Sequence, residues 1–183
     1  LASYPRQHLD AAGRARLARA TAELEASMRC RLDDWTSHYN RGNYLSDRGD
    51  PKGALKAYRE AIRLRPDALM PYVNSAMVYA RQGRPDRAEK HLTAALALAP
   101  KNAAANFNMG LLQAEKKNLK KAEKHLRAAL KAQPDMAQAA YNLGLLLAAD
   151  RPDEGIAMLQ KASALCPHAA RYGYSLAFYL DRS

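Results

Sequence analysis

The chain has 183 residues, 48% of them hydrophobic, and a formal net charge of +11 at pH 7. This length and composition suit a folded domain with a sizeable core and exclude a disordered chain. Apolar runs are short and interrupted by charge, so the sequence predicts no transmembrane segment, and it contains no recognisable signal peptide. The positive charge favours a partner with an acidic surface.

Residues 1–34 are expected to form a helical cap. The segment 21–35, TAELEASMRCRLDDW, aligns with the later segment 55–69, LKAYREAIRLRPDAL. In this alignment Ala20, Leu24 and Ser27 match small, bulky and small residues of the later segment. The segment is therefore interpreted as a degenerate second helix of a helix pair, placed ahead of the first complete pair.

From Trp35 onward the sequence repeats with a period of 34 residues, over 35–68, 69–102, 103–136 and 137–169. Counted from Trp35 as position 1, position 8 is small in every repeat: Gly42, Ala76, Gly110 and Gly144. Position 20 is also small: Ala54, Ala88, Ala122 and Gly155. Position 24 is bulky: Tyr58, Leu92, Leu126 and Leu159. Position 27 is alanine and position 32 is proline: Ala61, Ala95, Ala129 and Ala162; Pro66, Pro100, Pro134 and Pro167.

This pattern predicts two antiparallel helices in each repeat. Small residues at helical spacing let the two helices approach closely, and the bulky residue fills the wedge between them. Turn residues at 47–51, 81–86, 116–120 and 150–153 separate the two helices, and the proline ends the second. The fourth repeat lacks one residue in its turn, ADRPDEG, so its later landmarks arrive one position early.

The pattern resembles the tetratricopeptide repeat, whose unit is a helix–turn–helix of 34 residues. The resemblance implies an all-α fold, a right-handed superhelix of antiparallel helix pairs. Residues 170–183 resemble the first helix of a fifth repeat, with Leu176, Ala177 and Leu180 at positions 7, 8 and 11. No second helix follows in this sequence, so we expect either a continuing parent chain or self-association through this C-terminal edge.

In tetratricopeptide repeats the first helix lines the concave face, and one asparagine per repeat falls on that face here. These are the position-6 residues Asn40, Asn74, Asn108 and Asn142. Beside them stand Tyr39, Asn43, Phe107 and Tyr141. An amide both donates and accepts hydrogen bonds, as a peptide backbone does. The resemblance therefore implies a non-catalytic scaffold that binds a peptide or protein segment in this groove. The alternative is that position-6 asparagines only bond to a neighbouring helix.

Other kinds of site fit the sequence less well. The carboxylate clamp of chaperone-binding repeats needs cations where this chain has Tyr39, Ala104 and Asn108, so it is rejected even though Asn43 and Asn74 match. His91 and His125 recur one repeat apart, too far to share a metal ion, and are interpreted as solvent-facing residues. No phosphate loop, nucleophile motif or paired carboxylates appear, so neither an enzyme nor a cofactor is predicted.

The densest basic run is 115–127, EKKNLKKAEKHLR. Such a run is typical of a solvated face. The alternative is a surface for an acidic protein or another anion. A nucleic-acid partner is disfavoured because no aromatic residues that could stack on bases are interleaved.

Cys30 and Cys166 lie at opposite ends of the chain, in apolar helical contexts. Both are interpreted as small core residues, without a disulfide between them. Neither belongs to a CxxC or CxxCH motif, so neither a metal site nor a covalent haem is predicted.

The C-terminal stretch, with Arg171, Tyr172 and Tyr174, resembles the repeat tails of bacterial multihaem c-type cytochromes. That resemblance implies an interaction module of a larger exported protein, serving assembly or oligomerisation instead of peptide capture. It places the protein in the periplasm; otherwise a free-standing bacterial adaptor in the cytoplasm is expected.

Overall fold

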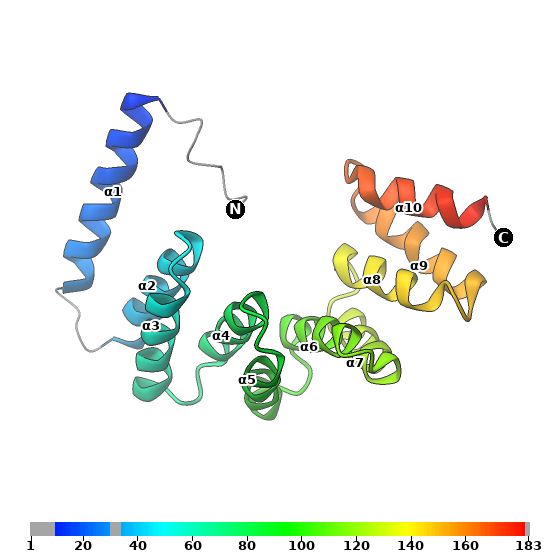
Figure 1. The fold of residues 1–183 in the computed structure, drawn as a ribbon, viewed down its shortest axis with the longest axis horizontal. Coiled ribbons are helices and arrows are strands. Elements are labelled where there is room, and N and C mark those ends of the chain that lie inside the picture. The colour runs from blue at the N-terminus through cyan, green and yellow to red at the C-terminus, as the bar shows by residue number, and fades with distance from the viewer. Residues whose placement is uncertain (1–9, 30–33, 182–183) are drawn as a thin grey trace. The chain divides into compact units, whose positions relative to one another are not determined.

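The computed structural model describes residues 10–29, the side chains of 24–29 excepted, and residues 34–181. Within these residues it contains ten α-helices and no strand. Figure 1 shows the helices following one another from α1 in blue to α10 in red. Their bounds are α1 Ala11–Arg29, α2 Trp35–Asp47, α3 Pro51–Leu64, α4 Leu69–Arg81, α5 Pro85–Leu98, α6 Ala103–Glu115, α7 Leu119–Ala132, α8 Ala137–Leu147, α9 Pro152–Leu165 and α10 Ala170–Leu180.

The chain divides into two compact units, Leu1–Val78 and Tyr79–Ser183. The first holds α1, α2, α3 and most of α4, and the second holds the end of α4 and the helices that follow. In both units, helices that are neighbours in sequence pack as antiparallel pairs, α2 with α3, α6 with α7 and α8 with α9.

The seam of each pair is built as the spacing predicts. A side chain on Gly42 would collide with the Tyr58 ring, and one on Gly110 would lie 2.8 Å from Leu126 Cγ. The four position-27 alanines are completely buried: Ala61, Ala95, Ala129 and Ala162. The prediction that small residues admit a bulky residue from the partner helix is therefore confirmed.

The second helices end where the prolines require. The helices α3, α5, α7 and α9 each stop two residues before Pro66, Pro100, Pro134 or Pro167. The residue between is extended, for example Arg65 with φ −139° and ψ 86°, because the proline ring disfavours helical geometry just before it.

Two of the turns between paired helices contain a glycine in the left-handed region, Gly49 with φ 76° and Gly83 with φ 66°. One repeat later, the same position holds Lys117 with φ 60°. A residue with a side chain is disfavoured there, so this turn carries backbone strain that the glycine turns avoid.

The fourth repeat, one residue shorter, has its turn between α8 and α9. Here the backbones come closer than elsewhere, because a side chain on Gly155 would lie 2.8 Å from both Cα and N of Ala148. This explains why position 20 is glycine in this repeat and alanine in the other three.

The ends of the chain correspond less fully to expectation. Of residues 10–23, all except Gly13 and Thr21 are exposed, so the capping role of residues 1–34 stays a prediction, as does the division into repeats and a fifth first helix. Cys166 is exposed, and its interpretation as a core residue is wrong: it is the extended residue before Pro167, past the end of α9. Cys30 lies outside the described residues.

Candidate functional site

In the first unit, the predicted site residues bond to one another. Asn74 Nδ2 donates to Asn43 Oδ1 at 2.7 Å and to Tyr39 OH at 3.3 Å. The same Asn43 oxygen accepts from Tyr58 OH at 2.8 Å. Both amide hydrogens of Asn74 are thus used between α2 and α4, whereas the preceding asparagine, Asn40, is exposed. The expectation that an unliganded Asn74 faces open solvent is therefore wrong.

In the second unit, the equivalent asparagines bond to their own helices. Asn108 Nδ2 donates to the Ala104 carbonyl at 2.8 Å, and Asn142 Nδ2 donates to the Gln138 carbonyl at 2.7 Å. Each acceptor lies four residues earlier in the same helix, where a short polar side chain can reach it. These two amides hold no neighbouring helix through these bonds, and both residues are partly exposed.

The difference follows from position 5 of the preceding repeat. Tyr39 offers its hydroxyl to Asn74, and Tyr141 shares a hydrogen bond of 3.1 Å with Ser175 Oγ, at position 6 of the next helix. Phe107 precedes Asn142 by one repeat and has no hydroxyl, so Asn142 turns to its own helix.

The three aromatic residues at position 5 also pack between repeats. Phe107 lies against Leu143 and Leu147, joining α6 to α8. The Tyr141 ring centroid lies 4.7 Å from that of Tyr172 in α10, and the Arg171 guanidinium stands over both rings, at 5.2 and 5.0 Å. Such cation–π contacts help to hold α10 against α8.

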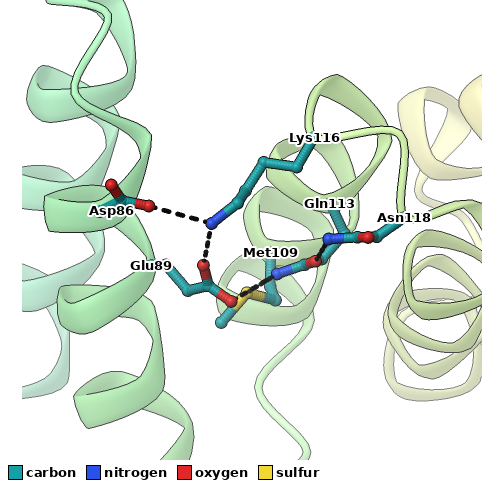
Figure 2. A network of polar contacts seen from close by, with 6 residues as sticks. All are labelled: Asp86, Glu89, Met109, Gln113, Lys116 and Asn118. Atoms are coloured by element: carbon teal, nitrogen blue, oxygen red, sulfur yellow. Dashed lines mark hydrogen bonds and ion pairs between the residues drawn. The ribbon is translucent and has the colours of Figure 1, made fainter.

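Sequence reasoning missed a buried polar network between α5 and α6 (Figure 2). Gln113, only 2% exposed, donates to Glu89 Oε1 at 2.8 Å and accepts from Asn118 Nδ2 at 2.9 Å. Lys116 Nζ bridges Glu89 at 2.6 Å and Asp86 at 3.1 Å. The hydrogen bonds from Lys116 and Gln113 lower the pKa of Glu89, and the network ties consecutive repeats together.

A second missed residue is Asn106, 3% exposed. Its Nδ2 donates to the carbonyls of Pro100 at 2.9 Å and Asn102 at 3.0 Å. One repeat earlier, Tyr72 OH donates to the Pro66 carbonyl at 3.0 Å. Polar residues at position 4, each 34 residues apart and six residues after the proline, were the available signal.

The two repeated histidines are half-buried, so their interpretation as solvent-facing is wrong. The His91 ring packs 5.2 Å from Tyr79, and His125 Nδ1 lies 3.0 Å from Asn106 Oδ1. Because both Nδ2 hydrogens of Asn106 go to carbonyls, its oxygen must accept, and His125 Nδ1 therefore carries the hydrogen. Burial lowers the pKa of His125, and Lys124 and Lys121 lower it further.

An ion-pair network joins α7 to the start of α9. Glu123 accepts from Arg151 at 2.5 Å and from Arg127 at 2.9 Å, and Glu154 pairs with both arginines. The arginines lower the pKa of Glu123. This network and that of Figure 2 engage the carboxylates between consecutive repeats of the second unit.

Two general properties bear on function. No helix among the described residues is long and apolar enough to cross a membrane. In the same part of the chain, no three His, Cys, Asp or Glu side chains gather where they could hold a metal ion.

Solved structures of several bacterial proteins resemble this chain. MamA from Desulfovibrio magneticus RS-1, from residue 41 to its end, is 29% identical over 81% of this chain and 84% of that chain, with a TM-score of 0.70. TTC0263, a repeat protein of Thermus thermophilus, is 24% identical over 91% and 93%, with a TM-score of 0.73. Neither structure is described as a cytochrome, so that resemblance stays a prediction.

YrrB, described as a repeat protein with an unusual peptide-binding site, is 20% identical over 87% of this chain and 82% of that chain, with a TM-score of 0.69. No curated protein sequence matches the chain significantly. Models of the tetratricopeptide repeat match residues 35–68, 73–137 and 118–170, which is most of the chain. The predicted all-α solenoid of helix pairs is thus confirmed, and the chain belongs to the tetratricopeptide repeat family.

Proposed function

We propose that this chain is a scaffold that binds an extended peptide segment along the first helices of its repeats. The tetratricopeptide repeat is generally a non-catalytic interaction fold, and stacked repeats present extended binding surfaces. The peptide specificity and the residues that grip it belong to the proposal.

The observation that carries the proposal is the bonding of Asn108 and Asn142 within their own helices. Their acceptors, the carbonyls of Ala104 and Gln138, lie four residues earlier in α6 and α8. Exchanging such a bond for one to a ligand leaves every contact between helices in place. An amide can then donate to a peptide carbonyl and accept from a peptide N–H, with little dependence on the peptide's sequence.

The other candidate residues have graded roles in this proposal. Asn40 is exposed and can reach a ligand in the same way. Asn74 and Asn43 are committed to each other and to Tyr39, so they shape the surface and contribute less to gripping. Phe107 and Tyr141, both partly exposed, offer apolar contact beside the amides of the second unit.

The test uses a peptide selected from a random library against the unaltered protein. Asn108→Ala with Asn142→Ala should weaken its binding by about 1–3 kcal/mol, the sum of two net hydrogen bonds of about 0.5–1.5 kcal/mol each. A matched control, Gln133→Ala with Gln160→Ala, removes two exposed amides, one just past the end of α7 and one in α9. Binding that survives in the asparagine variant, or falls equally in the control, contradicts the proposal.

Assembly through the C-terminal helix is the second candidate function, and one observation favours it. On α10, Tyr174 is 75% exposed although it occupies position 5, where Tyr39 and Tyr141 pack between repeats. A second copy of the chain would supply the missing neighbour. Sedimentation equilibrium should then show association that Tyr174→Ser abolishes, and a monomer at high concentration contradicts this alternative.

A further inference from the structure

Two of the second helices carry the same stripe of basic side chains. The residues occupy positions 18, 22, 25 and 29 of the first and third repeats: Lys52, Lys56, Arg59 and Arg63 in α3; Lys120, Lys124, Arg127 and Lys131 in α7. This spacing places each set on one helix face, along about 16 Å of helix. All eight side chains are exposed.

The stripe is not a general property of the second helices. At the same positions α5 has Asp86, Lys90, Thr93 and Ala97, and α9 has Asp153, Ala157, Gln160 and Ala164. These residues are exposed as well, so solubility does not require four cations on this face. The stripe distinguishes the first and third repeats from the second and fourth.

Stability does not account for the stripe either. Like charges four residues apart weaken a helix, and cations in a first turn, such as Lys120 of α7, oppose the helix dipole. Local carboxylates compensate only one residue in each stripe: Glu60 pairs with Arg63 at 2.8 Å, and Glu123 pairs with Arg127 at 2.9 Å. No carboxylate of the described residues pairs with the other three, which are Lys52, Lys56 and Arg59 in α3 and Lys120, Lys124 and Lys131 in α7.

We propose that each stripe is a docking surface for a segment of a partner protein rich in aspartate and glutamate. This surface lies on second helices and is separate from the proposed peptide site on first helices. The charge of the whole chain, +11, would attract such a partner. Each stripe lies within one unit, so each acts and is tested by itself.

The surroundings of the stripes favour a protein over other polyanions. Within the described residues, α3 exposes no large hydrophobic side chain and α7 exposes one, Leu119. The aromatic residue of α3, Tyr58, is buried. Single-stranded nucleic acid is usually held by exposed aromatic rings, and membrane-surface helices insert apolar side chains. A carboxylate-rich segment needs neither, because spaced cations suffice.

The test measures binding of a fluorescent oligoglutamate peptide to the whole chain. One variant combines Lys52→Gln, Lys56→Gln and Arg59→Gln; the other combines Lys120→Gln, Lys124→Gln and Lys131→Gln. Each should weaken binding by about 3- to 100-fold, the range that three exposed ion pairs span. Added salt should weaken binding to the unaltered chain more than to either variant.

The matched control removes three exposed cations elsewhere, by Arg81→Gln, Arg84→Gln and Lys101→Gln, with the same loss of charge. It should change affinity less than about twofold, and all variants should melt as the unaltered chain does. An equal loss in the control would show an effect of net charge alone and overturn the proposal. Tighter binding of oligothymidylate or of phosphatidylserine vesicles, lost in the same stripe variants, would overturn it in favour of nucleic acid or membrane.

Discussion

The hydroxyl of Tyr141 lies 3.1 Å from Ser175 Oγ, which places the side chain of one repeat in contact with the following helix. Tyr39 and Asn74 have the same relationship in the first unit, at 3.3 Å. A tyrosine at position 5 thus determines whether the residue at position 6 of the next repeat is held in place or left to its own helix.

Removing the held asparagine should therefore differ from removing a free one. Asn74→Ala deprives Asn43 and Tyr39 of a donor, and we expect it to lower the free energy of unfolding by about 1–2 kcal/mol. Asn142→Ala replaces a poor helix former that holds no neighbouring helix, so stability should stay constant or rise by about 0.5 kcal/mol. Urea denaturation of both variants provides the measurement, and equal effects would contradict this division of roles.

Phe107→Tyr should transfer the asparagine from one state to the other. The new hydroxyl would stand before Asn142 as that of Tyr39 stands before Asn74, and would draw its amide away from the Gln138 carbonyl. We expect binding of the library-selected peptide to weaken severalfold, while melting changes little. Phe107→Leu, which removes the ring without adding a hydroxyl, is the control. Unchanged binding by the tyrosine variant would argue against a role for Asn142.

The helix-pair framework could be predicted from sequence, while the hydrogen bonds of the amides could not. Gly110 and Leu126 identified the seam because packing between paired helices is fixed by spacing along one repeat. The partner of Asn74 depends on Tyr39 in the preceding repeat, and an amide is equally able to bond to its own helix. His125 was misread for the same reason, because its face is decided by Asn106 on another helix.

The two helical glycines Gly144 and Gly173 should respond oppositely to alanine. A side chain on Gly144 would lie 2.8 Å from Leu159 Cγ and 2.9 Å from the Gly155 carbonyl oxygen, and the backbone cannot yield. Gly144→Ala should therefore destabilise by about 1–3 kcal/mol, as overpacking does. Gly173 in α10 has nothing within 4 Å, so Gly173→Ala should stabilise by about 0.5–1 kcal/mol. Calorimetric melting distinguishes the two, and a common direction would contradict the seam geometry.

Lys117→Gly should stabilise the protein by about 1 kcal/mol, because it removes a side chain from the left-handed region. The reverse change at the equivalent turn, Gly83→Lys, should cost a similar amount, since Gly83 has φ 66°. Chemical denaturation of the two variants tests the pair. A destabilising Lys117→Gly would mean that the lysine side chain contributes more than the strain costs.

His125 should make stability depend on pH in mildly acidic solution. Its pKa is lowered in the fold by burial and by Lys124 and Lys121, below its ordinary value of 6.5. The unfolded chain therefore takes up this proton first, and the contribution of the neutral ring is complete above pH 6.5 and is lost as pH falls below it. His125→Asn keeps a donor for Asn106 and should flatten the melting profile over this range. A profile identical to that of the unaltered chain would assign the effect to other groups.

The close approach of Gly155 to Ala148 has a consequence for the ancestry of the fourth repeat. Loss of one residue from its turn and loss of one methyl group at position 20 compensate each other, since neither fits with the longer alternative of the other. The two changes should therefore have been inherited together. Descendants of the same gene should pair a full-length turn with alanine, or a short turn with glycine. An intermediate with the short turn and alanine would have had to force apart two helices that meet through their backbones.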